Sequence, residues 1–107
     1  MAVNIEHVND KQCRVVVTGE MTIYVAAELK ASLLPVLDKY QEIVMDLAGV
    51  SEMDASGLQL LVLAKTEALA RGKILHITEH SPAVLEVLSL CDIESFFGDP
   101  VVISSQV

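Results

Sequence analysis

The sequence predicts a single α/β domain in which helices pack against a mixed central β-sheet. Short apolar runs with the two-residue period of strands alternate with longer runs that follow the helical repeat, in the order ββαβαβαβ. The chain has 107 residues, of which 52% are hydrophobic and 21% are charged, and this composition is typical of an ordered protein with one core. We therefore expect one domain over residues 1–107, with its core at about 3–103.

The first two strands are expected to form a hairpin. Apolar or half-apolar residues alternate in both strands, at Val3, Ile5 and His7 and then at Cys13, Val15 and Val17. Residues 9–11 (Asn-Asp-Lys) between them are typical of a turn, and the second strand is expected to end at residues 19–20. Because Val16 places an apolar side chain on the other face, we expect the second strand to be covered on both sides.

A helix that the Thr22 side chain caps is expected next. Its apolar positions follow the helical repeat at Val25, Ala26, Leu29, Leu33, Val36 and Leu37. Pro35 lies within this repeat and removes the hydrogen bond to the Ala31 carbonyl. We therefore expect Pro35 to kink or shorten the helix.

The middle of the chain predicts a short buried strand, Ile43–Leu47, and a loop, Ala48–Met53, that leads to Asp54 and Ser56. The helix from Leu58 to Ala70 is apolar on most of its circumference, so it must be covered on most sides. Excess apolar residues in its first turn would also suit a surface for protein docking. Gly72 is expected to end this helix, with Arg71 at the negative end of the helix dipole.

The C-terminal part predicts a strand over residues 74–77 and a helix that begins at Ser81-Pro82, with proline at the first helical position. The residues after this helix lead to a final strand, Val101–Ile103.

Ser56 stands where the central helix begins, and two interpretations of it are open. Ser56 and Gln59 have the spacing of a capping box, in which the serine side chain only satisfies backbone N–H groups. A helix start also carries partial positive charge, so the fold would tolerate a phosphate on Ser56. Asp54 is expected either to position the loop or to orient Ser56.

The charge of the chain argues against nucleic acid and membrane surfaces as direct partners. Seven basic and fifteen acidic residues give a net charge of −8, which repels phosphate backbones and anionic lipid headgroups. The first residues lack the pattern of a secretion signal, and no stretch has the ~18 apolar residues of a membrane span. We therefore expect a cytoplasmic protein that acts through other proteins.

We expect neither an enzyme nor a bound cofactor or metal. Asp54 and Ser56 have no general base beside them in the sequence, and the chain lacks a nucleophile elbow and a phosphate-binding loop. Asp46 is expected to accept backbone hydrogen bonds at the end of its strand. His76 and His80 are four residues apart, which would pair them on a helix, but His76 lies in the predicted strand, where this spacing does not converge on one ion. Cys13 and Cys91 are expected to be buried thiols.

Two blocks of the sequence resemble the STAS domain, the family of anti-sigma factor antagonists. One block is Val44-Met45-Asp46-Leu47 with the segment 53–58 (Met-Asp-Ala-Ser-Gly-Leu), and the other is 17–21 (Val-Thr-Gly-Glu-Met) with 26–29. The resemblance extends over nearly the whole chain and implies the same α/β fold. In phosphorylated members, a partner kinase modifies the Ser or Thr directly before the glycine, which here is Ser56. The preceding position, often a second serine, is Ala55.

The resemblance implies a partner-switching function in bacterial signal transduction and transcription regulation. The implied partners are a serine kinase of the anti-sigma factor type and a phosphatase, with neither direct binding to nucleic acid nor membrane insertion. The implied binding surface consists of Thr22, Asp54, Ala55, Ser56, Gly57, Leu58 and Gln59. Thr22 replaces an aspartate that many phosphorylated members carry after Gly-Glu-Leu. The alternative is a non-phosphorylated accessory subunit of an ABC-type membrane transporter, which would use the same surface.

Overall fold

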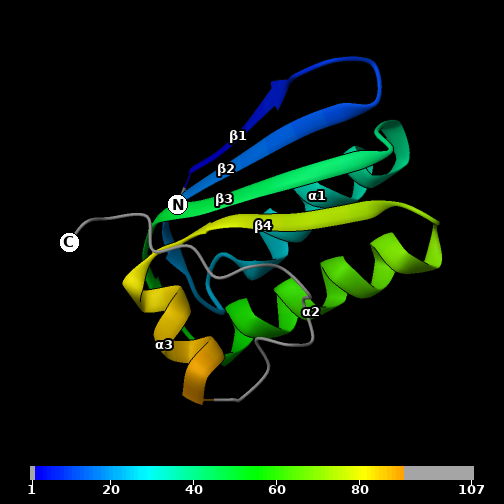
Figure 1. The fold of residues 1–107 in the computed structure, drawn as a ribbon. Coiled ribbons are helices and arrows are strands. Elements are labelled where there is room, and N and C mark those ends of the chain that lie inside the picture. The colour runs from blue at the N-terminus through cyan, green and yellow to red at the C-terminus, as the bar shows by residue number, and fades with distance from the viewer. Residues whose placement is uncertain (1, 91–107) are drawn as a thin grey trace.

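The computed structural model describes residues 2–90 and shows the predicted α/β architecture (Figure 1). Its elements are β1 (Ala2–His7), β2 (Gln12–Met21), α1 (Ala26–Lys39), β3 (Glu42–Met53), α2 (Ala55–Ala70), β4 (Ile74–His80) and α3 (Pro82–Leu90). The predicted final strand, Val101–Ile103, and Cys91 lie outside the described residues.

The sheet has the order β1-β2-β3-β4. The predicted hairpin is confirmed, because β1 pairs antiparallel with β2 through a turn in which the Asn9 side chain accepts from Lys11 and Gln12 N–H groups. The pairs β2–β3 and β3–β4 are parallel. Both crossovers step in the same direction across the sheet, so their right-handed geometry places α1 and α2 on one face. The first residues of both helices therefore lie at the carboxyl ends of the parallel strands.

The core lies between this face and the helices. Alternate residues of β2 (Cys13, Val15 and Val17) are buried there, together with β3 side chains and five leucines of the helices: Leu29, Leu33 and Leu37 of α1, and Leu60 and Leu61 of α2. Val16 is only half-buried, so the expected burial of β2 on both faces is wrong. Polar residues occupy the face that Val16 shares, which explains the difference.

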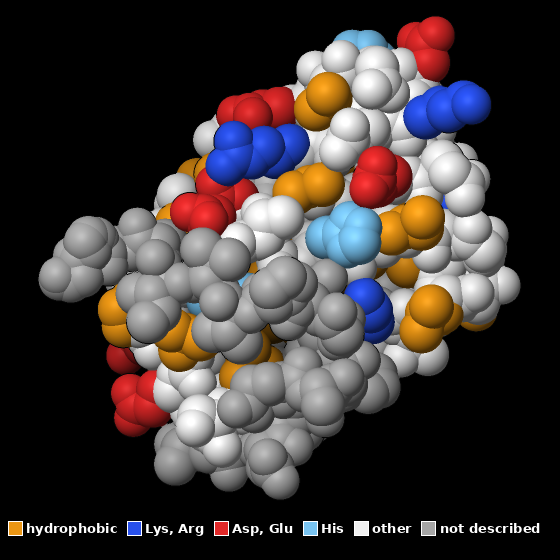
Figure 2. Space-filling view, in the orientation of Figure 1, with side chains coloured by type: hydrophobic (Ala, Val, Ile, Leu, Met, Phe, Trp, Pro, Cys, Tyr) orange, Lys and Arg blue, Asp and Glu red, His pale blue; other side chains and the backbone are white. Residues whose placement is uncertain are grey.

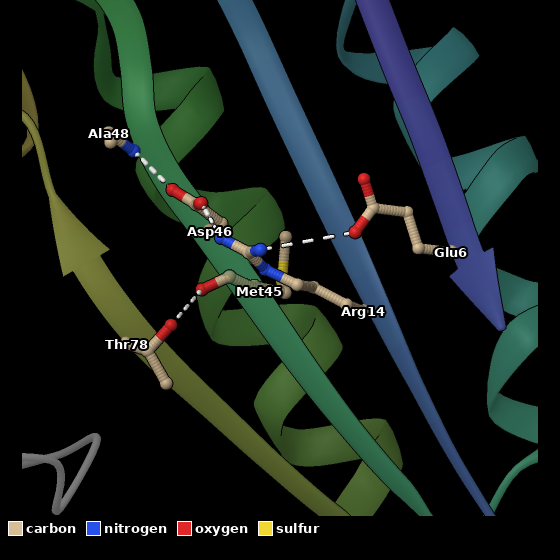
Figure 3. A network of polar contacts seen from close by, with 6 residues as sticks. All are labelled: Glu6, Arg14, Met45, Asp46, Ala48 and Thr78. Atoms are coloured by element: carbon tan, nitrogen blue, oxygen red, sulfur yellow. Dashed lines mark hydrogen bonds and ion pairs between the residues drawn. The ribbon is translucent and has the colours of Figure 1, made fainter. Parts of the chain in front are cut away.

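Arg14 joins three strands on that second face. Figure 3 shows Arg14 between Asp46 of β3 and Glu6 of β1, with helices behind the strands. The guanidinium forms an ion pair with Asp46 and lies 3.9 Å from a Glu6 oxygen. Asp46 also accepts the Ala48 N–H at 2.9 Å, so the predicted backbone hydrogen bond is confirmed. The expectation that Asp46 ends its strand is wrong, because β3 continues to Met53. Asp46 is only 8% exposed, and its contacts with Arg14 and the Ala48 N–H offset the cost of burying its carboxylate charge.

β3 is longer than the sequence predicts, and the expected loop Ala48–Met53 is wrong. Thr18 pairs with Gly49, and Met21 pairs with Met53, so the strand extends to the start of α2. The pairing shifts register between Val16 and Thr18 and again between Gly19 and Glu20. These irregularities break the alternation that identifies a strand in sequence, while pairing with β2 still supplies the backbone hydrogen bonds.

The start and end of α1 also differ from expectation. The N-cap residue is Val25, which has no side-chain cap, whereas Thr22 is buried and its backbone carbonyl accepts from Val25 and Ala26. The predicted side-chain cap by Thr22 is therefore wrong. Pro35 lies inside α1 without shortening it, because the helix continues to Lys39.

The end of α2 and the start of α3 follow the sequence closely, whereas α2 begins at Ala55, three residues before the predicted Leu58. Gly72 has φ +69°, and the Lys73 N–H bonds to the Ala68 carbonyl at 2.7 Å, so Gly72 ends α2 as predicted. The Ser81 hydroxyl accepts the Val84 N–H at 3.2 Å, and α3 begins at Pro82 as predicted.

Candidate functional site

Asp54 organises the start of α2. Its Oδ1 accepts the N–H groups of Ser56 at 2.9 Å and Gly57 at 3.2 Å, and it is the N-cap of the helix. Its Oδ2 accepts the Ile23 N–H at 3.2 Å, which ties the β2–α1 connection to the same point. Of the two roles left open for Asp54, the structural one is confirmed. The expectation that Ser56 caps the helix is wrong, because the cap lies two residues earlier.

These contacts keep Asp54 ionised. Desolvation raises the pKa of the carboxyl, but the N–H groups of Ile23, Gly57 and Ser56 together outweigh it and hold the pKa below its ordinary value. A fixed negative charge therefore lies two residues before Ser56.

Gly57 allows the start of α2 to approach the end of β2. The residue is buried, and a Cβ placed on it would overlap the Met21 backbone carbonyl oxygen and lie 3.1 Å from the Met53 side chain. Asp54 N–H also bonds to the Met21 carbonyl, at 3.3 Å. The glycine before Leu58 is thus required by packing, and it fixes where Ser56 stands.

Ser56 is half-buried in the first turn of α2 and lines an open depression between α1 and α2. The depression has a volume of about 250 Å³, and its other lining residues are Ala26, Ala27, Lys30, Gln59, Leu60 and Leu63. Within the described part of the chain, the Ser56 hydroxyl forms no hydrogen bond. The oxygen is therefore free to react or to bind a partner.

Two large apolar side chains stand exposed beside this depression. Ile23 is 65% exposed and Tyr24 is 92% exposed in the connection that Asp54 holds. Leu63, on the depression wall, is also exposed. Exposed apolar side chains that gather around a polar site are typical of a protein interface.

The structure brings most of the predicted binding residues together. Ala55 and Gln59 are exposed on the first turns of α2, whereas Leu58 is half-buried and packs against the core. Thr22 lies on the adjoining connection, but the residue is only 9% exposed. Sequence reasoning missed Ile23, Tyr24 and Lys30. For Ile23 and Tyr24, the sequence did contain a signal of an exposed binding surface, because two adjacent apolar residues stand between a strand and a helix.

Among the described residues, the histidines and Cys13 do not line the depression around Ser56. His76 lies 3.3 Å from Glu42 on the second face of the sheet, while His80 is buried. Burial raises the pKa of the Cys13 thiol, which the charge of Lys39 opposes, and Cys13 is a buried free thiol as predicted. Among residues 2–90 no cluster of histidine, cysteine and carboxylate side chains is arranged to hold a metal.

The side of the molecule in Figure 2 shows no continuous basic surface that would bind a polyanion. There, basic side chains stand singly among acidic and hydrophobic ones rather than in a stripe. None of the helices within the described range has the length and apolar character needed to span a membrane.

Comparison with known proteins identifies the family. A family model described as Mlab, STAS domain, matches residues 6–102. The fold is similar to that of an anti-sigma factor antagonist from Mycobacterium paratuberculosis, with a TM-score of 0.79 and 23% identity over 97% of this chain and 86% of that one.

SpoIIAA, an anti-sigma factor antagonist, is similar in two forms. The unphosphorylated form has a TM-score of 0.75 and 18% identity over 96% of this chain and 90% of that one. The phosphorylated form, from Bacillus, has a TM-score of 0.71 and 19% identity over 96% and 93%. These structural matches support the fold, and the family model covers nearly the whole sequence. The chain therefore belongs to the STAS domain family.

Proposed function

We propose that this STAS domain is a cytoplasmic partner-switching regulator whose surface around Ser56 binds a kinase of the anti-sigma factor type. The observation that carries the proposal is the position of Ser56. Its unbonded hydroxyl lines an open depression beside the exposed Ile23 and Tyr24. A kinase that docks on the apolar pair would have the hydroxyl within its interface.

In the proposed cycle, phosphorylation ends the complex. The kinase transfers the γ-phosphoryl group of ATP to Ser56 Oγ, the hydroxyl loses its proton, and ADP leaves. A phosphatase later hydrolyses the ester and restores the serine. The domain is the substrate in both steps, and its own role is to present the serine.

The physical cause of release is charge. A phosphate adds about −1.5 to −2 charges at Ser56, close to ionised Asp54 and on a chain that already carries −8. Burying this anion in a protein interface is costly unless the partner supplies a cation. A differential cost of ~3 kcal/mol would weaken binding about 150-fold.

The first test is mass spectrometry of the endogenous protein from exponential and stressed cells, with phosphatase inhibitors present. A phosphate on the Ser56 peptide whose occupancy changes with growth condition is expected. Complete absence of this modification in every condition would overturn the phosphorylation cycle.

A binding titration with the co-purified kinase tests the charge effect. Ser56→Ala should bind constitutively, and Ser56→Asp should bind at least several-fold more weakly than wild type. Ser89→Ala, which changes an exposed serine on α3, is the matched control and should behave as wild type. Equal affinity of all four proteins would contradict a charge switch at Ser56.

A second candidate is a stable accessory subunit of an ABC-type transporter, which we propose would dock through the same surface. The large exposure of the apolar Ile23 and Tyr24, which follow the buried Thr22, favours the accessory subunit. Permanent protein interfaces are more hydrophobic than transient ones. Co-purification separates the two candidates. A stoichiometric complex that requires detergent extraction supports the subunit, whereas a soluble kinase or phosphatase supports partner switching.

A further inference from the structure

Lys30 is a cation without an ion pair in the part of the chain that the structure describes. Four other basic side chains of residues 2–90 have partners: Arg14 pairs with Asp46, Arg71 with Asp38, Lys65 donates to the Leu75 carbonyl, and Lys39 lies over the Tyr40 ring. Lys30 has no such contact, although acidic residues outnumber basic ones on this chain. Lys11 and Lys73 lack such a contact as Lys30 does, but of these three lysines only Lys30 lines the depression around Ser56. An exposed lysine in this setting is available for a new anion.

The helical repeat places Lys30 in the depression that Ser56 lines. Ala26, Ala27 and Lys30 form the α1 wall, and Ser56 begins the α2 wall. Because the two alanines are small, Lys30 is the charged side chain of this wall. Its flexible stem allows the ammonium group to follow an anion within the depression.

Two carboxylates near the depression bear on whether Lys30 can pair with an anion there. Asp54 would repel an anion at Ser56, and Glu67 is an alternative ion-pair partner for Lys30. Asp54 precedes Ser56, but its oxygens are engaged by the N–H groups of Ser56, Gly57 and Ile23. Glu67 lines a narrower groove with Lys30 farther along α2, three helical turns from Ser56. Neither carboxylate forms an ion pair with Lys30.

We propose that Lys30 is the internal counter-ion of the phosphate on Ser56. This inference rests on the proposed function for the origin of the phosphate. Capture of Lys30 keeps the phosphate in the depression of its own domain. The ion pair also neutralises the Lys30 charge on the surface that binds the partner. Phosphorylation therefore changes the charge of the interface at Ser56 and at Lys30.

The test uses full-length protein in which phosphoserine is installed at position 56 by genetic code expansion. Phosphorus NMR then follows the second ionisation of the phosphate with pH. A lysine nearby favours the dianion, so the second pKa should be lower in wild type than in Lys30→Gln by about half a unit. Lys30→Arg should retain the wild-type value, because it retains the charge.

Lys11→Gln is the matched control, because Lys11 is exposed in the hairpin turn at the opposite end of β2. It should leave the phosphate pKa unchanged. Identical titrations of wild type and Lys30→Gln would overturn the inference. This result is independent of the proposed function, because the phosphoserine is installed without a kinase, whereas failure to find modified Ser56 in cells affects the proposed function alone.

Discussion

At the scale of single residues, Asp54, Ser56 and Gly57 have different roles at the start of α2. Asp54 satisfies the first N–H groups, and Gly57 permits close packing on the end of β2. The Ser56 side chain is therefore not needed for capping. A hydroxyl that the fold does not use is available for modification without a large loss of stability.

The pH dependence of stability should identify Asp54 as an ionised cap. Its pKa in the folded protein is depressed, so its contribution is present above its pKa in the unfolded chain and is lost as pH falls through the folded value. Asn also caps helices but does not ionise. Thermal melts should show wild type more stable than Asp54→Asn at neutral pH, with the difference disappearing toward pH ~2.

Asp10→Asn, in the exposed hairpin turn, is the control for a general effect of removing one negative charge. It should not reproduce the pH-dependent difference. A gap between wild type and Asp54→Asn that stays constant from neutral to acidic pH would contradict an ionised cap.

Gly57→Ala should destabilise the domain although alanine is the better helix former. The new methyl group overlaps the Met21 backbone carbonyl, and overpacking of this kind costs about 1–3 kcal/mol, against a gain in helix propensity of about 1 kcal/mol. We expect a net loss of up to about 2 kcal/mol in urea unfolding. Gly49→Ala meets a Thr18 methyl group at 2.7 Å instead, and a side chain moves more easily than backbone. A smaller loss for Gly57→Ala than for Gly49→Ala would contradict this account.

At the scale of elements, the sequence predicted every helix and strand of residues 2–90, but not all of their boundaries. Apolar residues recur every two positions in a strand and about every 3.6 positions in a helix, because one face of each element is buried. These periods therefore locate an element in the sequence. The end of β3 was missed because its register shifts break the alternation, and only the β2 partner sustains the strand. The start of α1 was missed because a backbone turn at Thr22 replaces the side-chain cap.

Pro35→Ala should stabilise α1. Proline leaves the Ala31 carbonyl without its helical donor, and its cost inside a helix is ~3 kcal/mol, partly offset by its restriction of the unfolded chain. Because Pro35 is exposed, alanine creates no cavity, and we expect the free energy of unfolding to rise by about 1 kcal/mol or more. Pro82→Ala is the control, since the first position of α3 needs no intrahelical donor and should gain little. Equal gains at both positions would contradict the explanation.

At the scale of the whole molecule, the topology explains why the site residues meet. Parallel pairing of β2 with β3 brings Met21 opposite Met53, so the residues that follow each strand, 22–25 and 54–56, lie together at one end of the sheet. The motif around Ser56 was readable from sequence. The contribution of Ile23, Tyr24 and Lys30 was not, because they belong to the site only through strand pairing and the packing of α1 beside α2.

This arrangement predicts that phosphorylation leaves the fold unchanged. The depression around Ser56 is open, so a phosphate fits without displacing the core, and the added charge acts locally.

Amide spectra of unmodified and Ser56-phosphorylated protein should therefore differ only in residues around the depression, about 21–30 and 54–63, where the electric field of the phosphate is strongest. The amides of the β1–β2 hairpin turn, residues 8–11, lie at the opposite end of the sheet, so they serve as the internal control and should not shift. Widespread shifts along β1 would mean that the sheet rearranges, and a partner would then be released by a change of shape instead of by charge alone.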